Sequence, residues 1–105
     1  MAIKPFIDEL STLGKQILPE GASLWLYGSR ARGDAREDSD WDLLLLLDKD
    51  KREPNDWERF CRPIDDFGFN RGQYMSPHLY TKREWQKMSF MPFVKNVEHD
   101  KIVLV

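Results

Sequence analysis

Two aspartates near the middle of the chain have the type and spacing of a metal site. Asp40 and Asp42 flank Trp41 at the start of the apolar run 43–47, which indicates a buried strand. Because side chains alternate along a strand, both carboxylates point to one face and Trp41 points to the other, into the core. Neighbouring carboxylates repel each other unless a cation lies between them, and Mg²⁺ takes such oxygen ligands. The pair predicts a Mg²⁺ site rather than a solvated strand end.

A glycine–serine pair precedes the first of these aspartates by a gap of ten residues. Gly28 and Ser29 follow the short aromatic segment 22–27 and precede residues 30–36, which can form a short helix. Glycine permits close approach of the backbone to a ligand, and amide groups at a helix start favour phosphate oxygens. With the serine hydroxyl as a further hydrogen-bonding group, the segment predicts a triphosphate site.

Three arginines after the serine supply positive charge suited to a polyphosphate. On a helix only Arg32 and Arg36 share a face, and Arg36 has acidic neighbours with which it can pair. Arg30, next to Ser29, is the arginine that we predict to bind the nucleotide, and a position away from phosphate is an equal alternative for it.

The elements that must position these groups alternate between helix and strand. Apolar spacing, capping signals and prolines predict helices over residues 5–18, from Pro54 to a stop or kink at Pro63, from residue 81, and over 90–97, with strands over 22–27, 41–48, 73–80 and 102–105. The strand 41–48 is apolar on both faces and is therefore central, whereas Pro77 predicts an edge or bulged strand. This order predicts one α/β (α+β) domain over residues 1–105.

Size and composition restrict the function further. The 105 residues include 16 Lys or Arg and 18 Asp or Glu, a formal charge of −2, which argues against a protein that wraps nucleic acid. No apolar run approaches the roughly 20 residues of a membrane span. A lone cysteine, Cys61, predicted as a core residue, and an N-terminus without secretory features predict a cytoplasmic protein. A domain of this size must share a large substrate with a partner.

The motif Gly28-Ser29, ten residues, Asp40-Trp41-Asp42, with Arg-Ala-Arg-Gly in the gap, resembles the signature of the DNA polymerase beta superfamily of nucleotidyltransferases. It is most similar to the minimal nucleotidyltransferases (MNT). The resemblance implies a mixed sheet of about four strands flanked by helices. It also implies that Gly28 and Ser29 bind the triphosphate, and that Asp40 and Asp42 are catalytic and hold Mg²⁺.

The same resemblance implies a reaction and a partner. The reaction is Mg²⁺-dependent transfer of a nucleoside monophosphate, AMP from ATP, to an acceptor hydroxyl. The MNT proteins commonly accompany a helical HEPN protein, often a ribonuclease toxin, and act as antitoxins by adenylylating a tyrosine of that toxin. Extension of a nucleic-acid 3′ end is a weaker expectation, because neither charge nor aromatic spacing indicates a strand-binding groove.

One departure from the family pattern supports an alternative. Catalytic members usually carry a third acid on a later strand, but residues 73–80 contain no Asp or Glu, and Asp48, Asp65 and Asp66 are poorly placed to replace it. His78 has the chemistry of a proton acceptor, although a partly buried histidine of an edge strand is the simpler interpretation. The alternative function is a weakly active or inactive binding module that neutralises its partner by docking.

Overall fold

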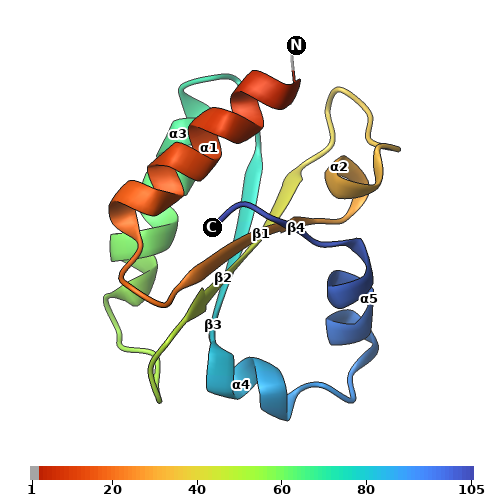
Figure 1. Cartoon of the computed structure of the whole chain (residues 1–105). Helices are drawn as coiled ribbons and strands as arrows, with labels where there is room; N and C mark the ends of the chain where they lie inside the picture. The colour runs from red at the N-terminus through yellow and green to blue at the C-terminus, as the bar shows by residue number, and fades with distance from the viewer. Residues whose placement is uncertain (1–2) are drawn as a thin grey trace.

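The computed structural model describes residues 3–105, which form a four-stranded sheet with helices on both faces (Figure 1). The strand order is β3-β2-β1-β4, with β2 parallel to β3 and with β1 antiparallel to both β2 and β4. The strands are β1 (Ser23–Tyr27), β2 (Trp41–Leu47), β3 (Met75–Thr81) and β4 (Ile102–Val103). The mixed four-stranded sheet confirms the predicted fold class.

The helices divide between the two faces of the sheet (Figure 1). One face packs against α1 (Ile3–Ile17) and α3 (Arg62–Phe69), and the other against α4 (Lys82–Lys87) and α5 (Pro92–Asp100). A single helical turn, α2 (Ser29–Arg32), joins β1 to the loop before β2. No helix within residues 3–105 has the length and apolar character to cross a membrane.

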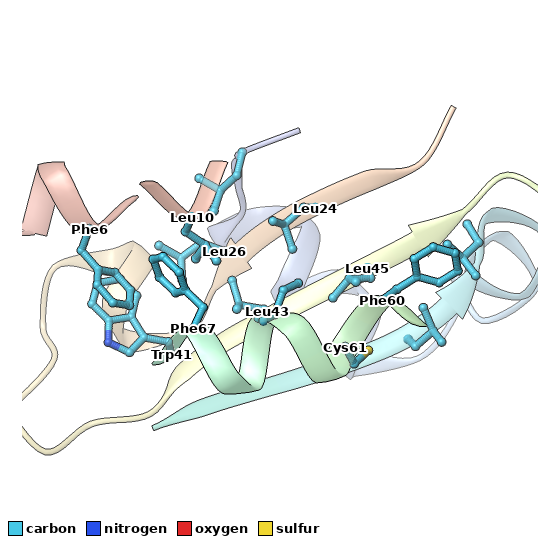
Figure 2. Packing of buried hydrophobic residues seen from close by; sticks show 14 residues of the cluster. Phe6, Leu10, Leu24, Leu26, Trp41, Leu43, Leu45, Phe60, Cys61 and Phe67 are labelled. Carbon is cyan, nitrogen blue, oxygen red and sulfur yellow. The ribbon is translucent and has the colours of Figure 1, made fainter. Parts of the chain in front are cut away.

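The central strand β2 connects the two hydrophobic cores. Trp41 and the odd-numbered leucines of β2 face α1 and α3, where the Trp41 ring lies 4.4 Å from that of Phe6 (Figure 2). Leu44 and Leu46 face α4 and α5, where they pack with Trp85. Burial of each leucine stabilises the fold by about 1.5–3 kcal/mol. The buried side chains therefore fix the position of β2. Asp42 is the one charged residue within this strand.

The helix does not end at Pro63, which was one of the two predicted alternatives; the helix type changes there instead. A π-helical turn, η1 (Trp57–Cys61), leads directly into α3. Pro63 is the second residue of α3 and lies where the chain changes from π-helical to α-helical hydrogen bonding, directly after the Arg62 N–H donates to the Trp57 carbonyl. As predicted, Cys61 is a buried core residue. Burial, with a smaller contribution from the negative charge of Asp65, raises the pKa of its thiol to about 12.

Two other boundaries also differ. The helix expected over residues 30–36 ends after Arg32, because Gly33 adopts the left-handed conformation, with φ of 85°. The exposed Phe90 lies between α4 and α5 rather than in a helix. The predicted capping box of α4 is confirmed: the Glu84 N–H donates to the Thr81 hydroxyl at 3.0 Å, and the Thr81 N–H donates to the Glu84 carboxylate at 2.8 Å.

Candidate active site

The sheet register brings the predicted metal and nucleotide motifs together. Asp42, the second residue of β2, pairs with Tyr27, the last residue of β1, and Gly28 follows Tyr27 directly. Gly28 has φ of 74°, and a Cβ atom built on it would overlap Oδ2 of Asp42. The glycine therefore serves two purposes: it permits the turn into α2, and it leaves room for the carboxylate.

The two aspartates interact electrostatically, as their spacing predicts. Partial burial raises the pKa of Asp42, and the negative charge of Asp40 raises it further, while His78 and Arg32 act in the opposite direction. Within residues 3–105 neither aspartate forms an ion pair with a basic side chain. This uncompensated negative charge suits a divalent cation.

The donor set fits Mg²⁺ only if the substrate contributes ligands. In the described part of the chain, no group of three or more His, Cys, Asp or Glu side chains could hold a metal ion. Mg²⁺ is commonly bound by one or two carboxylates together with phosphate oxygens and water. Asp40 and Asp42 are thus the residues that would hold it, and bound triphosphate would complete its coordination.

The strand that should carry a third acid carries a serine and a histidine instead. Ser76 of β3 is in register with Asp42, and His78 is in register with Leu44, so both face the same side as Asp42. Asp65 and Asp66 lie in α3, which covers the opposite face of the sheet, and Asp48 follows the far end of β2. The expectation that none of these three acids replaces the missing one agrees with their positions.

Gly28 and Ser29 occupy the turn that leads to α2. The Gly28 carbonyl accepts hydrogen bonds from the N–H groups of Ala31 and Arg32, at 3.1 and 3.0 Å, and Ser29 is the first residue of the helical turn. These bonds hold the turn at Gly28, the residue next to the Asp42 carboxylate, and Ser29 follows it directly. Contact of Ser29 with a nucleotide stays a prediction.

Arg30 makes three contacts with the protein itself. Its Nη2 donates to the carbonyls of Glu37 and Ser39, at 3.0 and 2.9 Å, and its guanidinium carbon lies 4.7 Å from the centre of the Trp41 ring. Trp41 points to the face opposite Asp42, and the two carbonyls belong to the loop before Asp40, so the Arg30 side chain holds this loop. Contact of Arg30 with a nucleotide stays a prediction.

Arg32 is the arginine on the side of Asp42. Its positive charge lowers the pKa of Asp42, while its guanidinium donates to Asp34 at 3.2 Å and to Asp100 at 2.8 Å. The pair with Asp100 links α2 to the end of α5, and Asp100 is only 11% exposed. The helical face that Arg32 was predicted to share with Arg36 does not form, because α2 ends at Arg32.

Aromatic side chains lie on the face of the sheet that carries Asp42, and among them only His78 was considered from the sequence. His78 is exposed rather than partly buried. The rings of Tyr27 and His78 lie 5.9 and 6.3 Å from that of Phe93. Burial and the nearby charge of Asp42 raise the pKa of Tyr27 to about 12, so its phenol stays protonated at neutral pH. The only signal for Tyr27 in the sequence is its position directly before Gly28.

Residues 3–104 match the family model of the nucleotidyltransferase domain. The chain belongs to this family. The match covers nearly the whole nucleotidyltransferase domain described above, from α1 to the last residues after β4, and includes both the Gly28-Ser29 turn and the aspartate pair.

A solved structure has the same fold. The nucleotidyltransferase domain is similar to a crystal structure of a toxin–antitoxin with AMP-PNP, with a TM-score of 0.62 and 16% sequence identity, over 94% of this chain and 72% of that chain. At this identity the likeness shows the fold alone. A comparison with curated proteins gave no match.

Proposed function

We propose that this nucleotidyltransferase domain transfers a nucleoside monophosphate, AMP from ATP, to an acceptor hydroxyl in a Mg²⁺-dependent reaction. The observation that carries the proposal is the contact between the Asp42 carboxylate and the Gly28 backbone. Two motifs that are ten residues apart in sequence meet at the adjacent ends of β1 and β2. A phosphate held at the glycine turn is therefore next to a carboxylate that can share a metal ion with it.

The side chains divide the work of phosphoryl transfer between them. Bound Mg²⁺ supplies positive charge that neutralises the phosphate oxygens and the departing pyrophosphate. Asp40 and Asp42 would hold the ion, and the Gly28–Ser29 turn would orient the triphosphate. Arg32, on the same side as Asp42, adds positive charge for the tail of the triphosphate. Positioning and electrostatics of this kind account for most of the catalysis of such reactions.

The acceptor that we propose is a hydroxyl of a HEPN toxin, which makes the domain an antitoxin. Two points support this: the resemblance of its motif to that of the MNT proteins, and the similarity of its fold to a structure described as a toxin–antitoxin with AMP-PNP. Residues 3–105 form a single domain around the sheet, with no second domain for an acceptor. A separate acceptor protein is consistent with this architecture.

A second function is favoured by one specific observation. Strand β3 presents Ser76 and His78, rather than an Asp or Glu, on the side of Asp42. A domain without the third carboxylate lacks the usual group for activation of the attacking hydroxyl. In this alternative the domain binds nucleotide with little turnover and neutralises its partner by docking.

One experiment separates the two functions. The protein is incubated with ATP labelled at the α-phosphate, Mg²⁺ and the protein encoded by the neighbouring gene, and label on that protein is measured. Transfer by the wild type that is lost with Asp42→Asn supports the transferase. A stable complex without transfer, unchanged by Asp42→Asn, supports docking. Parallel reactions with short RNAs test 3′-end extension. Products longer than the input RNA would show that the acceptor is RNA and not a protein.

A further inference from the structure

A groove of about 980 Å³ runs along the outer edge of β3; its lining does not include the aspartate pair or the glycine–serine turn. One end includes His78, whose register partner Leu44 lies two residues beyond Asp42 on β2. Two residues correspond to about 7 Å along a strand. The other end is bounded by the loop 50–54 and by α4. A molecule that lies in this groove can therefore reach the site of transfer.

A buried aspartate holds the loop 50–54, which forms one wall of the groove, in place. Asp56 is 1% exposed; it accepts a hydrogen bond from the Glu53 N–H and pairs with the Lys49 ammonium at 2.8 Å. Burial opposes ionisation of Asp56, but the Glu53 hydrogen bond and the Lys49 charge together hold its pKa below the usual range. The loop 50–54 is consequently tied at both ends rather than free to fold over the groove.

The edge of β3 that faces the groove is poorly suited to strand addition. Pro77 has no N–H group to donate, and the Leu79 carbonyl already accepts a hydrogen bond from Arg52 at 3.2 Å. Arg52 is itself fixed by Glu84, at 3.0 Å, and lies over the Tyr80 ring. A polypeptide in this groove is recognised through its side chains, because the backbone of β3 offers few free partners.

The charges in the groove favour an acidic occupant. Its three carboxylates are already paired with basic side chains, in the pairs Asp50–Arg83, Glu53–Lys49 and Glu84–Arg52. Lys51 and Lys87 also line the groove, are exposed, and form no ion pair within residues 3–105. Two lysines therefore remain for a ligand, beside the partly exposed ring of Trp57.

We infer that the groove binds an acidic, extended segment of the acceptor protein and leads its hydroxyl to the Asp40–Asp42 site. The inference rests on the proposed function, because it assigns the acceptor to a protein and to this surface. A nucleic acid fits less well, because its many phosphates require an extended basic surface, whereas the chain has a formal charge of −2 and the groove offers two unpaired lysines. The expected recognition pairs carboxylates of the segment with Lys51 and Lys87 and places an apolar side chain on Trp57.

Binding is tested first without nucleotide, on the full chain. The probes are fluorescein-labelled peptides with a central tyrosine between glutamates or between lysines, and the measurement is fluorescence anisotropy. We expect the acidic peptide to bind, the basic peptide not to bind, and the double variant Lys51→Glu/Lys87→Glu to bind the acidic peptide at least tenfold more weakly. Raised salt should weaken wild-type binding, because the contacts are exposed ion pairs.

The matched control is the double variant Lys15→Glu/Lys95→Glu. These lysines are exposed on α1 and α5, away from the groove, and the substitutions change the net charge by the same amount. Unchanged affinity in this control shows that the effect belongs to the groove. Equal losses in both double variants, equal binding of the two peptides, or single-stranded RNA that displaces the acidic peptide from the wild type would each overturn the inference.

A transfer assay separates this inference from the proposed function. With labelled ATP and the acidic peptide, Lys51→Glu/Lys87→Glu should raise KM for the peptide at least tenfold and leave KM for ATP unchanged. If that variant transfers label at wild-type efficiency, the groove does not bind the acceptor, and the proposed transferase activity still stands. Absence of transfer to any acceptor, with lysine-dependent binding of the acidic peptide retained, overturns the transferase and leaves the groove as a docking surface.

Discussion

The carboxylate of Asp42 lies against the backbone of Gly28, in space that the side chain of any other residue would fill. This contact links the strand that carries the aspartates to the turn that carries the serine. It also means that the glycine contributes in two separable ways, through its backbone conformation and through its missing Cβ atom.

Gly28→Ala tests the missing Cβ atom. The new methyl group displaces the Asp42 carboxylate, and a displacement of about 1 Å at a reacting centre can lower the rate about 100-fold. The residue must also keep φ of 74°, a strained conformation for alanine. We expect transfer to fall about 100-fold, with a smaller loss in thermal stability, as measured by label transfer and by thermal denaturation.

Gly33→Ala is the control for a positive φ, with ψ of 12° in place of the −156° of Gly28. Gly33 also has a positive φ, of 85°, but no atom lies within 4 Å of the position of its added Cβ. The variant should lose about 1–2 kcal/mol of stability from backbone strain and retain most of its transfer rate. Equal losses of activity in the two variants would show that strain, and not the Asp42 contact, explains the effect of Gly28→Ala.

Arg30 should contribute more to stability than to nucleotide binding. Arg30→Gln removes the two hydrogen bonds to the carbonyls of Glu37 and Ser39 and the stacking on Trp41. We expect the free energy of unfolding to fall by about 1–3 kcal/mol, as measured by denaturant titration. Arg36→Gln, which changes an exposed arginine of the same loop, should leave it unchanged.

The corresponding variant of Arg32 should behave in the opposite way. Arg32→Gln removes positive charge on the side of Asp42 and should weaken ATP binding several-fold, with little effect on AMP binding. Titration of each nucleotide measures the difference. If Arg30→Gln loses more ATP affinity than Arg32→Gln, Arg30 and not Arg32 is the arginine that binds the nucleotide.

The position of the aspartate pair could be predicted from the sequence because local rules determine it. A continuous apolar strand must be central, and alternation along it then places Asp42 opposite Trp41. The glycine–serine turn follows the neighbouring strand in chain order, so antiparallel pairing of β1 with β2 brings the two motifs together. The alternation follows from the order of residues, whereas the antiparallel pairing is a tertiary feature that was not predicted from the sequence.

The direction of Arg30 could not be predicted in the same way. A side chain on a single helical turn can leave on either side of the sheet, and the choice depends on the loop carbonyls and on Trp41, whose positions are tertiary. The helical turn also ends at Gly33, which removes the face that Arg32 and Arg36 would have shared. The continuation of the helix past Pro63 could not be predicted either, because it depends on where α3 begins, at Arg62.

Asp42 should destabilise the metal-free protein at neutral pH. Partial burial and the charge of Asp40 raise its folded-state pKa, so folding favours the protonated form. The resulting loss of stability is absent below the unfolded-state pKa and is fully present above the folded-state pKa. Asp42→Asn should therefore raise the melting temperature at pH 7, and the difference from the wild type should disappear as the pH is lowered through this interval.

Added Mg²⁺ provides the control for this prediction. A ligand that binds only the folded state raises its stability. At pH 7, Mg²⁺ together with a non-hydrolysable ATP analogue should raise the melting temperature of the wild type and leave that of Asp42→Asn nearly unchanged. An equal increase in both proteins would mean that the metal–nucleotide complex binds without Asp42.

Ser76→Asp tests whether the missing third carboxylate limits turnover. Ser76 is in register with Asp42 on the adjacent strand, so an aspartate there faces the same side as the pair. A correctly placed general base contributes about 100-fold or more to a rate, and we expect at least a tenfold increase in kcat with little change in KM for ATP. Ser76→Asn, which matches the size without the charge, should give no increase. If Ser76→Asp leaves kcat unchanged while His78→Gln abolishes transfer, the histidine already accepts the proton and the carboxylate is not missing in function.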